Sequence, residues 1–199
     1  MEGDPLNRIE SVRQRRVKHI ACVRNPWDRI HAVWKFSRQV GRIPEDTKFA
    51  DFVSRMPYKR PVATGNQISD ANNYFVYRHT TPTLFDAYIL DGVVEVDYLL
   101  YFENLGSALD SLQRKLGFSG GEMPWINRST DRRCYFDDYD PVLVKKVRGL
   151  YWNEIQLFGY QFAKPIERSL VQFFELNADF QDLQRKRAFR PMGPRPQAP

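Results

Sequence analysis

The sequence has few cysteines and no long apolar segment. Its two cysteines, Cys22 and Cys134, can form at most one disulfide and lack the spacing of a metal site. Two isolated thiols favour a reducing compartment such as the cytosol or nucleus. No run approaches the roughly 18 apolar residues of a membrane-spanning helix, and residues 1–16 lack the apolar core of a secretory signal. These absences indicate a cytoplasmic protein, or a Golgi or membrane-associated one if the chain is part of a longer protein.

The composition is that of a folded protein with an uneven charge. Hydrophobic residues make up 42% of the 199 residues and aromatic residues 14%, which excludes a wholly disordered chain. The net charge is +6, and residues 185–199 hold five Lys or Arg and no acid. Residues 8–29 hold seven Lys or Arg against two acids, while residues 1–184 as a whole are nearly neutral. This distribution favours a local anionic ligand over a nucleic-acid-binding surface.

Hydrophobic patterns predict strands that alternate with helices. Residues 17–23 and 97–102 are typical of buried strands, and residues 87–90 and 93–96 of two short strands around a turn. Residues 57–86 are predicted to be mostly loop with one short helix. The remaining predicted helices cover residues 5–15, 26–38, 47–56, 105–116, 141–151 and 166–187. The order indicates an α/β fold with a buried parallel sheet.

The same patterns predict the division of the chain. Residues 1–163 form the main domain and residues 164–187 a C-terminal helix. Residues 188–199 are basic and rich in proline, so they are predicted to be a disordered tail.

Residues 24–29 (RNPWDR) join a predicted strand to a predicted helix. Asn25 is a typical helix N-cap, and Pro26 suits the first helical turn. A strand that turns directly into a helix N-terminus directs N–H groups at its own carboxyl edge, where an anion binds. Arg24 can add a bidentate contact to phosphate. The residues alone support two interpretations equally well. Arg24 binds an anionic ligand, or Arg24 and Arg29 pair with Asp28 and other acids on the surface.

The sequence VRNPWDRIHAVWKF, at residues 23–36, resembles the 3′-phosphate-binding segment of sulfotransferases that use 3′-phosphoadenosine 5′-phosphosulfate (PAPS). Further segments are similar to other elements of this family and occur in the same order. They are KFADFV, RHTTPT, VDYLLYFENLGSALDSLQRKLGF, PWINRST and YFDDYDPVLVKKVRGLYWNEIQLFGYQF. The resemblance covers about residues 17–162 and is greatest to the carbohydrate, membrane-type branch of the family.

The resemblance implies a P-loop-like parallel sheet flanked by helices. It also implies that the first strand–loop–helix unit is missing, because residues 1–16 do not match the family's phosphosulfate-binding loop. The implied reaction moves a sulfuryl group from PAPS to a hydroxyl or amine of a carbohydrate acceptor. The implied partners are PAPS and a glycan, without nucleic acid or metal.

The resemblance also implies site residues. Arg24 and Ser129 are expected at the nucleotide. His79 is a candidate general base, although a histidine in a polar loop is more often only hydrogen-bonded. Ala32 stands where the family has a serine. His31 beside it either compensates for the absent hydroxyl or, as is more often the case for such a histidine, lies on the helix surface.

The missing loop leaves a second function open. In the family, the loop stabilises charge on the leaving phosphate, so transfer by this chain is expected to be weak. The alternative is a non-catalytic module that binds a nucleotide or polyanion and retains the fold. Glu103, at the end of a predicted strand, is placed either to serve a site or to hold a loop through a salt bridge.

Overall fold

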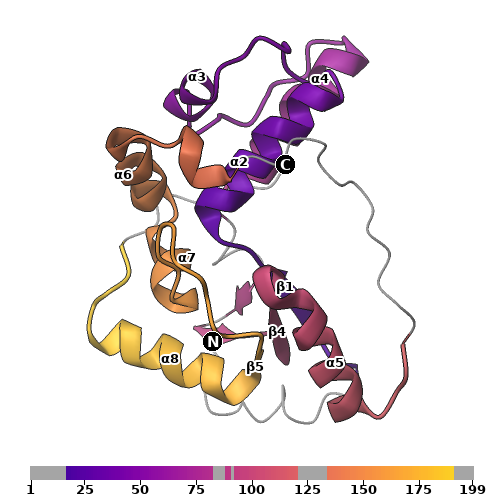
Figure 1. The fold of residues 1–199 in the computed structure, drawn as a ribbon, viewed down its shortest axis with the longest axis vertical. Helices are drawn as coiled ribbons and strands as arrows, with labels where there is room; N and C mark the ends of the chain where they lie inside the picture. The colour runs from indigo at the N-terminus through magenta and orange to yellow at the C-terminus, as the bar shows by residue number, and fades with distance from the viewer. Residues whose placement is uncertain (1–16, 83–87, 91, 121–133, 191–199) are drawn as a thin grey trace, which may run out of the picture.

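The structure, a computed structural model, describes residues 17–82, 88–90, 92–120 and 134–190. It is an α/β protein in which helices flank a small sheet, as the sequence predicted (Figure 1). Helices α2 (Pro26–Gln39), α3 (Phe49–Ser54) and α4 (Gln67–Thr80) lie at one end of the molecule. The sheet, α5 (Leu105–Leu116) and α8 (Phe173–Arg185) lie at the other end, while α6 (Pro141–Leu150) and α7 (Trp152–Phe158) run along one side.

The sheet has three strands in the order β1–β4–β5. Strand β1 (Ile20–Val23) pairs in parallel with β4 (Tyr98–Tyr101), and β4 pairs antiparallel with β5 (Leu170–Gln172). Strands β2 (Ile89–Leu90) and β3 (Val93–Val94) form a separate antiparallel pair. The sheet is therefore mixed, whereas the sequence predicted a parallel one. Since Val23 is paired with Tyr101, β1 and β4 end at the same edge.

Several predicted elements are confirmed by their local signals. Asn25 caps α2 through its side chain, Asp140 caps α6 in the same way, and Pro follows each cap. Gly117 ends α5 with a φ of 70°, a left-handed conformation that favours glycine. The predicted helix at residues 5–15 lies outside the described residues.

Two segments differ from the prediction because tertiary contacts decide them. Residues 67–80, predicted to be mostly loop, form the 14-residue helix α4, whose Phe75 packs against Phe36 of α2. Residues 170–172, predicted to be helical, form β5, which hydrogen-bonds to β4. Apolar spacing alone cannot show that a strand partner is present, so the predicted helix extended too far toward the N-terminus.

The main core lies between β1, β4 and the helices α2, α3, α6 and α7. Its largest fully buried side chains include Trp27, Tyr101, Tyr151 and Phe158, each at most 2% exposed. A second cluster covers the other face of the sheet, where Leu100 packs against α5. Burial of this apolar surface provides most of the driving force for folding. Cys22 and Cys134 are both free.

The first residues of the predicted tail are packed on α7. The indole Nε1 of Trp152 donates to the carbonyl of Ala188 at 2.7 Å. The side chain of Asn153 accepts from the N–H of Arg190 at 2.8 Å and donates to its carbonyl at 3.1 Å. The ring of Phe189 lies 5.3 Å from that of Phe180. Residues 188–190, predicted to belong to the disordered tail, are therefore packed against the protein, and residues 191–199 lie outside the described residues.

Candidate functional site

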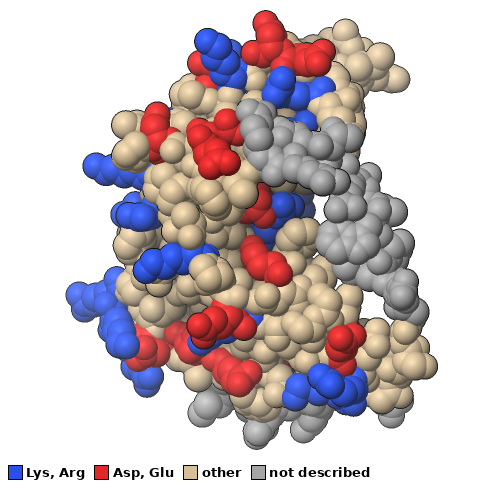
Figure 2. All heavy atoms as spheres, viewed as in Figure 1, with Lys and Arg blue, Asp and Glu red and all other residues tan. Residues whose placement is uncertain are grey.

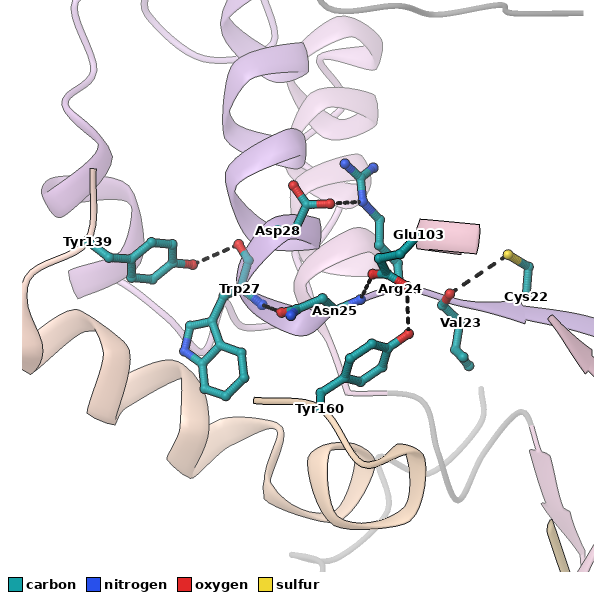
Figure 3. Close-up of polar contacts among 9 residues, drawn as sticks. All are labelled: Cys22, Val23, Arg24, Asn25, Trp27, Asp28, Glu103, Tyr139 and Tyr160. Atoms are coloured by element: carbon teal, nitrogen blue, oxygen red, sulfur yellow. Dashed lines mark hydrogen bonds and ion pairs between the residues drawn. The ribbon is translucent and has the colours of Figure 1, made fainter. Parts of the chain in front are cut away.

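The connection from β1 to α2 lies at the carboxyl edge of the parallel pair β1–β4 (Figure 3). Arg24 and Asn25 make up the whole connection. A 3₁₀ turn, η2 (Phe102–Asn104), follows β4 directly and brings Glu103 to the same edge. The N–H of Asn25 donates to Oε1 of Glu103 at 2.6 Å. The residues that follow two neighbouring parallel strands thus meet, at the edge where open α/β sheets bind ligands.

Asn25 organises the start of α2. Its Oδ1 accepts from the N–H of Trp27 at 3.1 Å, and its Nδ2 donates to the carbonyl of Gln161 at 3.4 Å. Pro26 has no N–H to offer. Two backbone donors near the helix start, those of Asn25 and Trp27, are therefore already paired inside the protein. An external anion at this turn is held by the helix dipole and by side chains more than by these N–H groups.

The guanidinium of Arg24 is contacted by Asp28 at one edge and by the ring of Phe102 on one face. Its Nε donates to Oδ2 of Asp28 at 2.6 Å, and its Cζ lies 4.3 Å from the centre of the Phe102 ring. The two terminal amino groups make no hydrogen bond to any described residue and point away from Asp28 (Figure 3). The predicted pairing of Arg24 with an acid is thus confirmed. The pair leaves the outer edge of the guanidinium available for a bidentate contact.

Glu103 joins three parts of the chain. Besides accepting from Asn25, its carboxylate accepts from the hydroxyl of Tyr160 at 3.2 Å through Oε2. Burial, and then the charge of Glu103, raise the pKa of Tyr160 far above its ordinary value. Tyr160 therefore stays protonated and remains a donor to Glu103. Both oxygens of Glu103 bind protein groups, which supports the interpretation that Glu103 holds the loops at this edge, here through hydrogen bonds.

Arg29, the second arginine of the segment, faces the interior. Its Nη2 lies 2.9 Å from Oε2 of Glu154, and its Cζ lies 4.7 Å from the centre of the Tyr151 ring. The hydroxyl of Tyr151 donates in turn to the carbonyl of Thr80. Arg29 therefore ties α2 to α7 and is a structural residue.

The expectation that His31 lies on the surface of α2 is wrong. Its ring is buried, with 2% of the residue exposed, and it contacts the rings of Trp34 and Phe49. Its Nε2 lies 2.8 Å from Oδ2 of Asp138. Burial lowers the pKa of His31, although the hydrogen bond to Asp138 opposes this shift. His31 is part of the core and does not replace the hydroxyl absent at Ala32.

His31 makes the stability depend on pH. Because its pKa is lower in the folded state, the unfolded chain binds more protons below about pH 6.5. The contribution of neutral His31 is complete above that pH and is lost as the pH falls. We expect the free energy of unfolding of wild type to exceed that of His31→Gln at pH 7.5. Urea unfolding at pH 7.5, 6.5 and 5.5 is expected to show that this difference shrinks as the pH falls. An advantage that stays constant with pH would contradict this expectation.

Of the other two predicted site residues, the structure describes only His79. His79 lies in the last turn of α4, stacks on Phe75 at 3.9 Å, and has its Nδ1 2.8 Å from the carbonyl of Phe75. A donor at Nδ1 leaves Nε2 as the nitrogen that can take a proton. No contact among the described residues links His79 to Arg24 or Glu103. Ser129 lies outside the described residues.

Sequence reasoning missed two residues of this site, Phe102 and Tyr160. Phe102 is next to Glu103 in the chain and was counted as part of the strand. Tyr160 is 57 residues away from Glu103, so only the tertiary structure shows their contact.

Comparisons with known proteins give no match, whether to a protein-family model, a curated protein or a solved structure. Within the described ranges, no cluster of His, Cys, Asp or Glu is suited to a metal ion. No helix in the described part of the chain has the length and apolar character needed to span a membrane. The arrangement around Arg24 is therefore the main structural basis for a functional proposal.

Proposed function

We propose that the chain is a sulfotransferase-like protein that binds PAPS, with the 3′-phosphate of the nucleotide against Arg24. The observation that carries the proposal is the position of Arg24 at the carboxyl edge of β1 and β4. Its guanidinium is oriented by Asp28 and Phe102, and its outer edge makes no hydrogen bond to a described residue. A phosphate group fits that edge with two parallel hydrogen bonds.

The proposal also includes the type of sheet. The sheet corresponds to part of a P-loop-like sheet whose first strand–loop–helix unit is missing. Among the described strands, β1 pairs with β4 alone, so one of its edges has no described partner.

The proposed reaction transfers a sulfuryl group to a hydroxyl or amine of a carbohydrate. A bond forms between the acceptor atom and sulfur, and the bond from sulfur to the 5′-phosphate oxygen breaks. The acceptor proton passes to a base, for which His79 is the candidate, and 3′-phosphoadenosine 5′-phosphate leaves. The acceptor class and the role of His79 rest on the sequence resemblance.

Calorimetry with 3′-phosphoadenosine 5′-phosphate tests the nucleotide site. Arg24→Ala is expected to weaken binding roughly ten- to hundredfold, because it removes charge-assisted hydrogen bonds worth about 1.5–3 kcal/mol. Arg185→Ala is the matched control, since the side chain of Arg185 is 76% exposed on α8.

A second nucleotide locates the contact. Adenosine 5′-phosphate lacks the 3′-phosphate, so the wild-type protein is expected to bind it more weakly than 3′-phosphoadenosine 5′-phosphate. Arg24→Ala is expected to lose this preference. Equal affinities of wild type and Arg24→Ala for 3′-phosphoadenosine 5′-phosphate, or no binding by either, would refute the proposal.

The second candidate function is a non-catalytic module that binds the nucleotide or a polyanion. One observation favours it: the N–H groups of Asn25 and Trp27 are already hydrogen-bonded inside the protein. Such a module is expected to bind the nucleotide at Arg24 without transferring the sulfuryl group.

A further inference from the structure

A groove runs along α6 and α7, and one of its two parts is also lined by Trp27 and Tyr160, which lie beside the Arg24 turn. It has two parts, with volumes of about 690 and 470 Å³, and both are lined by Arg148 and Phe162. Lys145 and Arg190 line the first part, and Lys164 lines the second. Figure 2 shows several Lys and Arg side chains along the side of the molecule where these helices lie.

The charge of the groove is positive and not neutralised by described acids. Asp140 is the only acid among the described residues that line it. Its Oδ1 accepts from the N–H of Leu143 at 2.8 Å, so its carboxylate is engaged as the N-cap of α6. No ion pair joins Lys145, Arg148, Lys164 or Arg190 to an acid in the described part of the chain. Several unneutralised cations around one groove attract an anion.

Arg190 is fixed in place beside the groove. The side chain of Asn153 binds both the N–H and the carbonyl of Arg190. The guanidinium of Arg190 lies 4.5 Å from the centre of the Trp152 ring. A cation held in this way loses little conformational freedom when an anion binds, which favours binding.

The larger part of the groove also has an apolar lining. Pro141, Val144 and Phe162 line the larger part together with the ring of Tyr139. Arg148, whose Cζ lies 5.9 Å from the centre of the Trp27 ring, stands where the two parts join. A mostly apolar lining that also holds a few cations is the usual composition of a site for an organic ligand that carries a charge.

We propose that this groove binds an organic anion, whose aromatic or aliphatic body lies on Val144 and Phe162. Its phosphate, sulfate or carboxylate group contacts Arg148 and Arg190. The proposed anion contacts, Arg148 and Arg190, do not include Arg24, and the ligand need not be a nucleotide.

The probe for the test is 2-naphthyl phosphate, measured by calorimetry on the full chain. Inorganic phosphate carries the charge without the body, and 2-naphthol carries the body without the charge. Wild type is expected to bind 2-naphthyl phosphate at least tenfold more tightly than either of the other two. Equal binding of inorganic phosphate, or of 2-naphthol, would overturn the proposal.

Variants locate the binding. Arg148→Gln is expected to weaken binding of 2-naphthyl phosphate roughly tenfold or more, because it removes a charged donor. Lys145→Glu, at an exposed position on α6, is expected to weaken it as well. The thermal unfolding of each variant shows whether it has folded. Arg185→Gln, which lies outside the groove, is expected to bind the probe as wild type does, and Arg24→Ala measures any binding of the probe at the proposed nucleotide site.

The results separate this site from the proposed nucleotide site. Loss of probe binding in Arg24→Ala, with no change in Arg148→Gln or Lys145→Glu, would overturn the proposal and assign the probe to the Arg24 site. Absence of binding by wild type would also overturn it. If wild type does not bind the nucleotide but Arg148→Gln loses binding of the probe, the proposal for the groove is supported and the proposed function is refuted.

Discussion

Replacing Glu154 with alanine is expected to lower the free energy of unfolding by about 3 kcal/mol. The side chain of Glu154 is 5% exposed, and its Oε2 accepts from Nη2 of Arg29 at 2.9 Å. Removal of this carboxylate leaves a guanidinium whose Nε already lacks a hydrogen-bond partner among the described residues. The value lies at the lower end of the range for buried pairs, because the side chain of Arg29 is still 25% exposed.

The measurement is thermal and urea unfolding of the variant beside wild type. A loss of this size lowers the melting temperature by roughly 6 to 12 °C in a protein of this length. The matched control is Asp179→Ala. Asp179 pairs with Arg168 at the same 2.9 Å, but the two side chains are 38% and 47% exposed. Such a pair contributes less than about 1 kcal/mol.

A double variant distinguishes the ion pair from general packing. Arg29→Met combined with Glu154→Leu removes both charges and keeps apolar volume, so it is expected to be more stable than Glu154→Ala alone. Similar losses in Glu154→Ala and Asp179→Ala would show that the pair is not effectively buried.

The strand–turn–helix unit around Arg24 was predictable because its signals are local. An apolar run rich in β-branched residues forms β1, and Asn25 followed by Pro26 defines the start of α2. The same reasoning located α5, whose apolar spacing and final Gly117 are both present in one short segment. Each of these signals depends on neighbours in the sequence, so no knowledge of the tertiary structure was needed.

The remainder of the site depends on contacts between distant segments. Glu103 was recognised as the end of a strand, but its bonds to Asn25 and Tyr160 join residues 78 and 57 positions apart. His31 was misplaced for another reason. It follows Ile30 and precedes Trp34 by three residues, so it falls within the apolar stripe of α2. The polarity of a histidine favours the surface, but this position favours the core, and a hydrogen bond to Asp138 removes the penalty of burying the ring.

The 199-residue chain is expected to bind 3′-phosphoadenosine 5′-phosphate but to transfer sulfuryl groups at a rate near background. As the bond from sulfur to the 5′-phosphate breaks, negative charge develops on the leaving oxygen, and catalysis requires oriented donors or a cation there. Loss of one such donor typically slows a reaction roughly 100- to 1,000-fold. The N–H groups of Asn25 and Trp27 cannot serve the leaving oxygen, because they lie beside Arg24 at the 3′-phosphate and already bind the carboxylate of Glu103 and the side chain of Asn25.

The available cations do not change this expectation. Arg24 is assigned to the 3′-phosphate, at the other end of the nucleotide. Lys18 precedes β1 at the opposite end from Arg24, and its Nζ lies 3.2 Å from Oδ1 of Asp97. An ion pair with a carboxylate that is 8% exposed holds Lys18 away from the site.

An assay with sulfur-labelled PAPS and a panel of unsulfated glycans measures the transfer. Calorimetry on the same sample establishes that the nucleotide binds, and an active sulfotransferase with the same glycans shows that the assay works. The expected result is nucleotide binding that depends on Arg24, with no labelled glycan above background. Robust transfer by wild type that is abolished in Arg24→Ala would contradict this expectation, because it would require a group that stabilises the leaving phosphate beyond the described contacts.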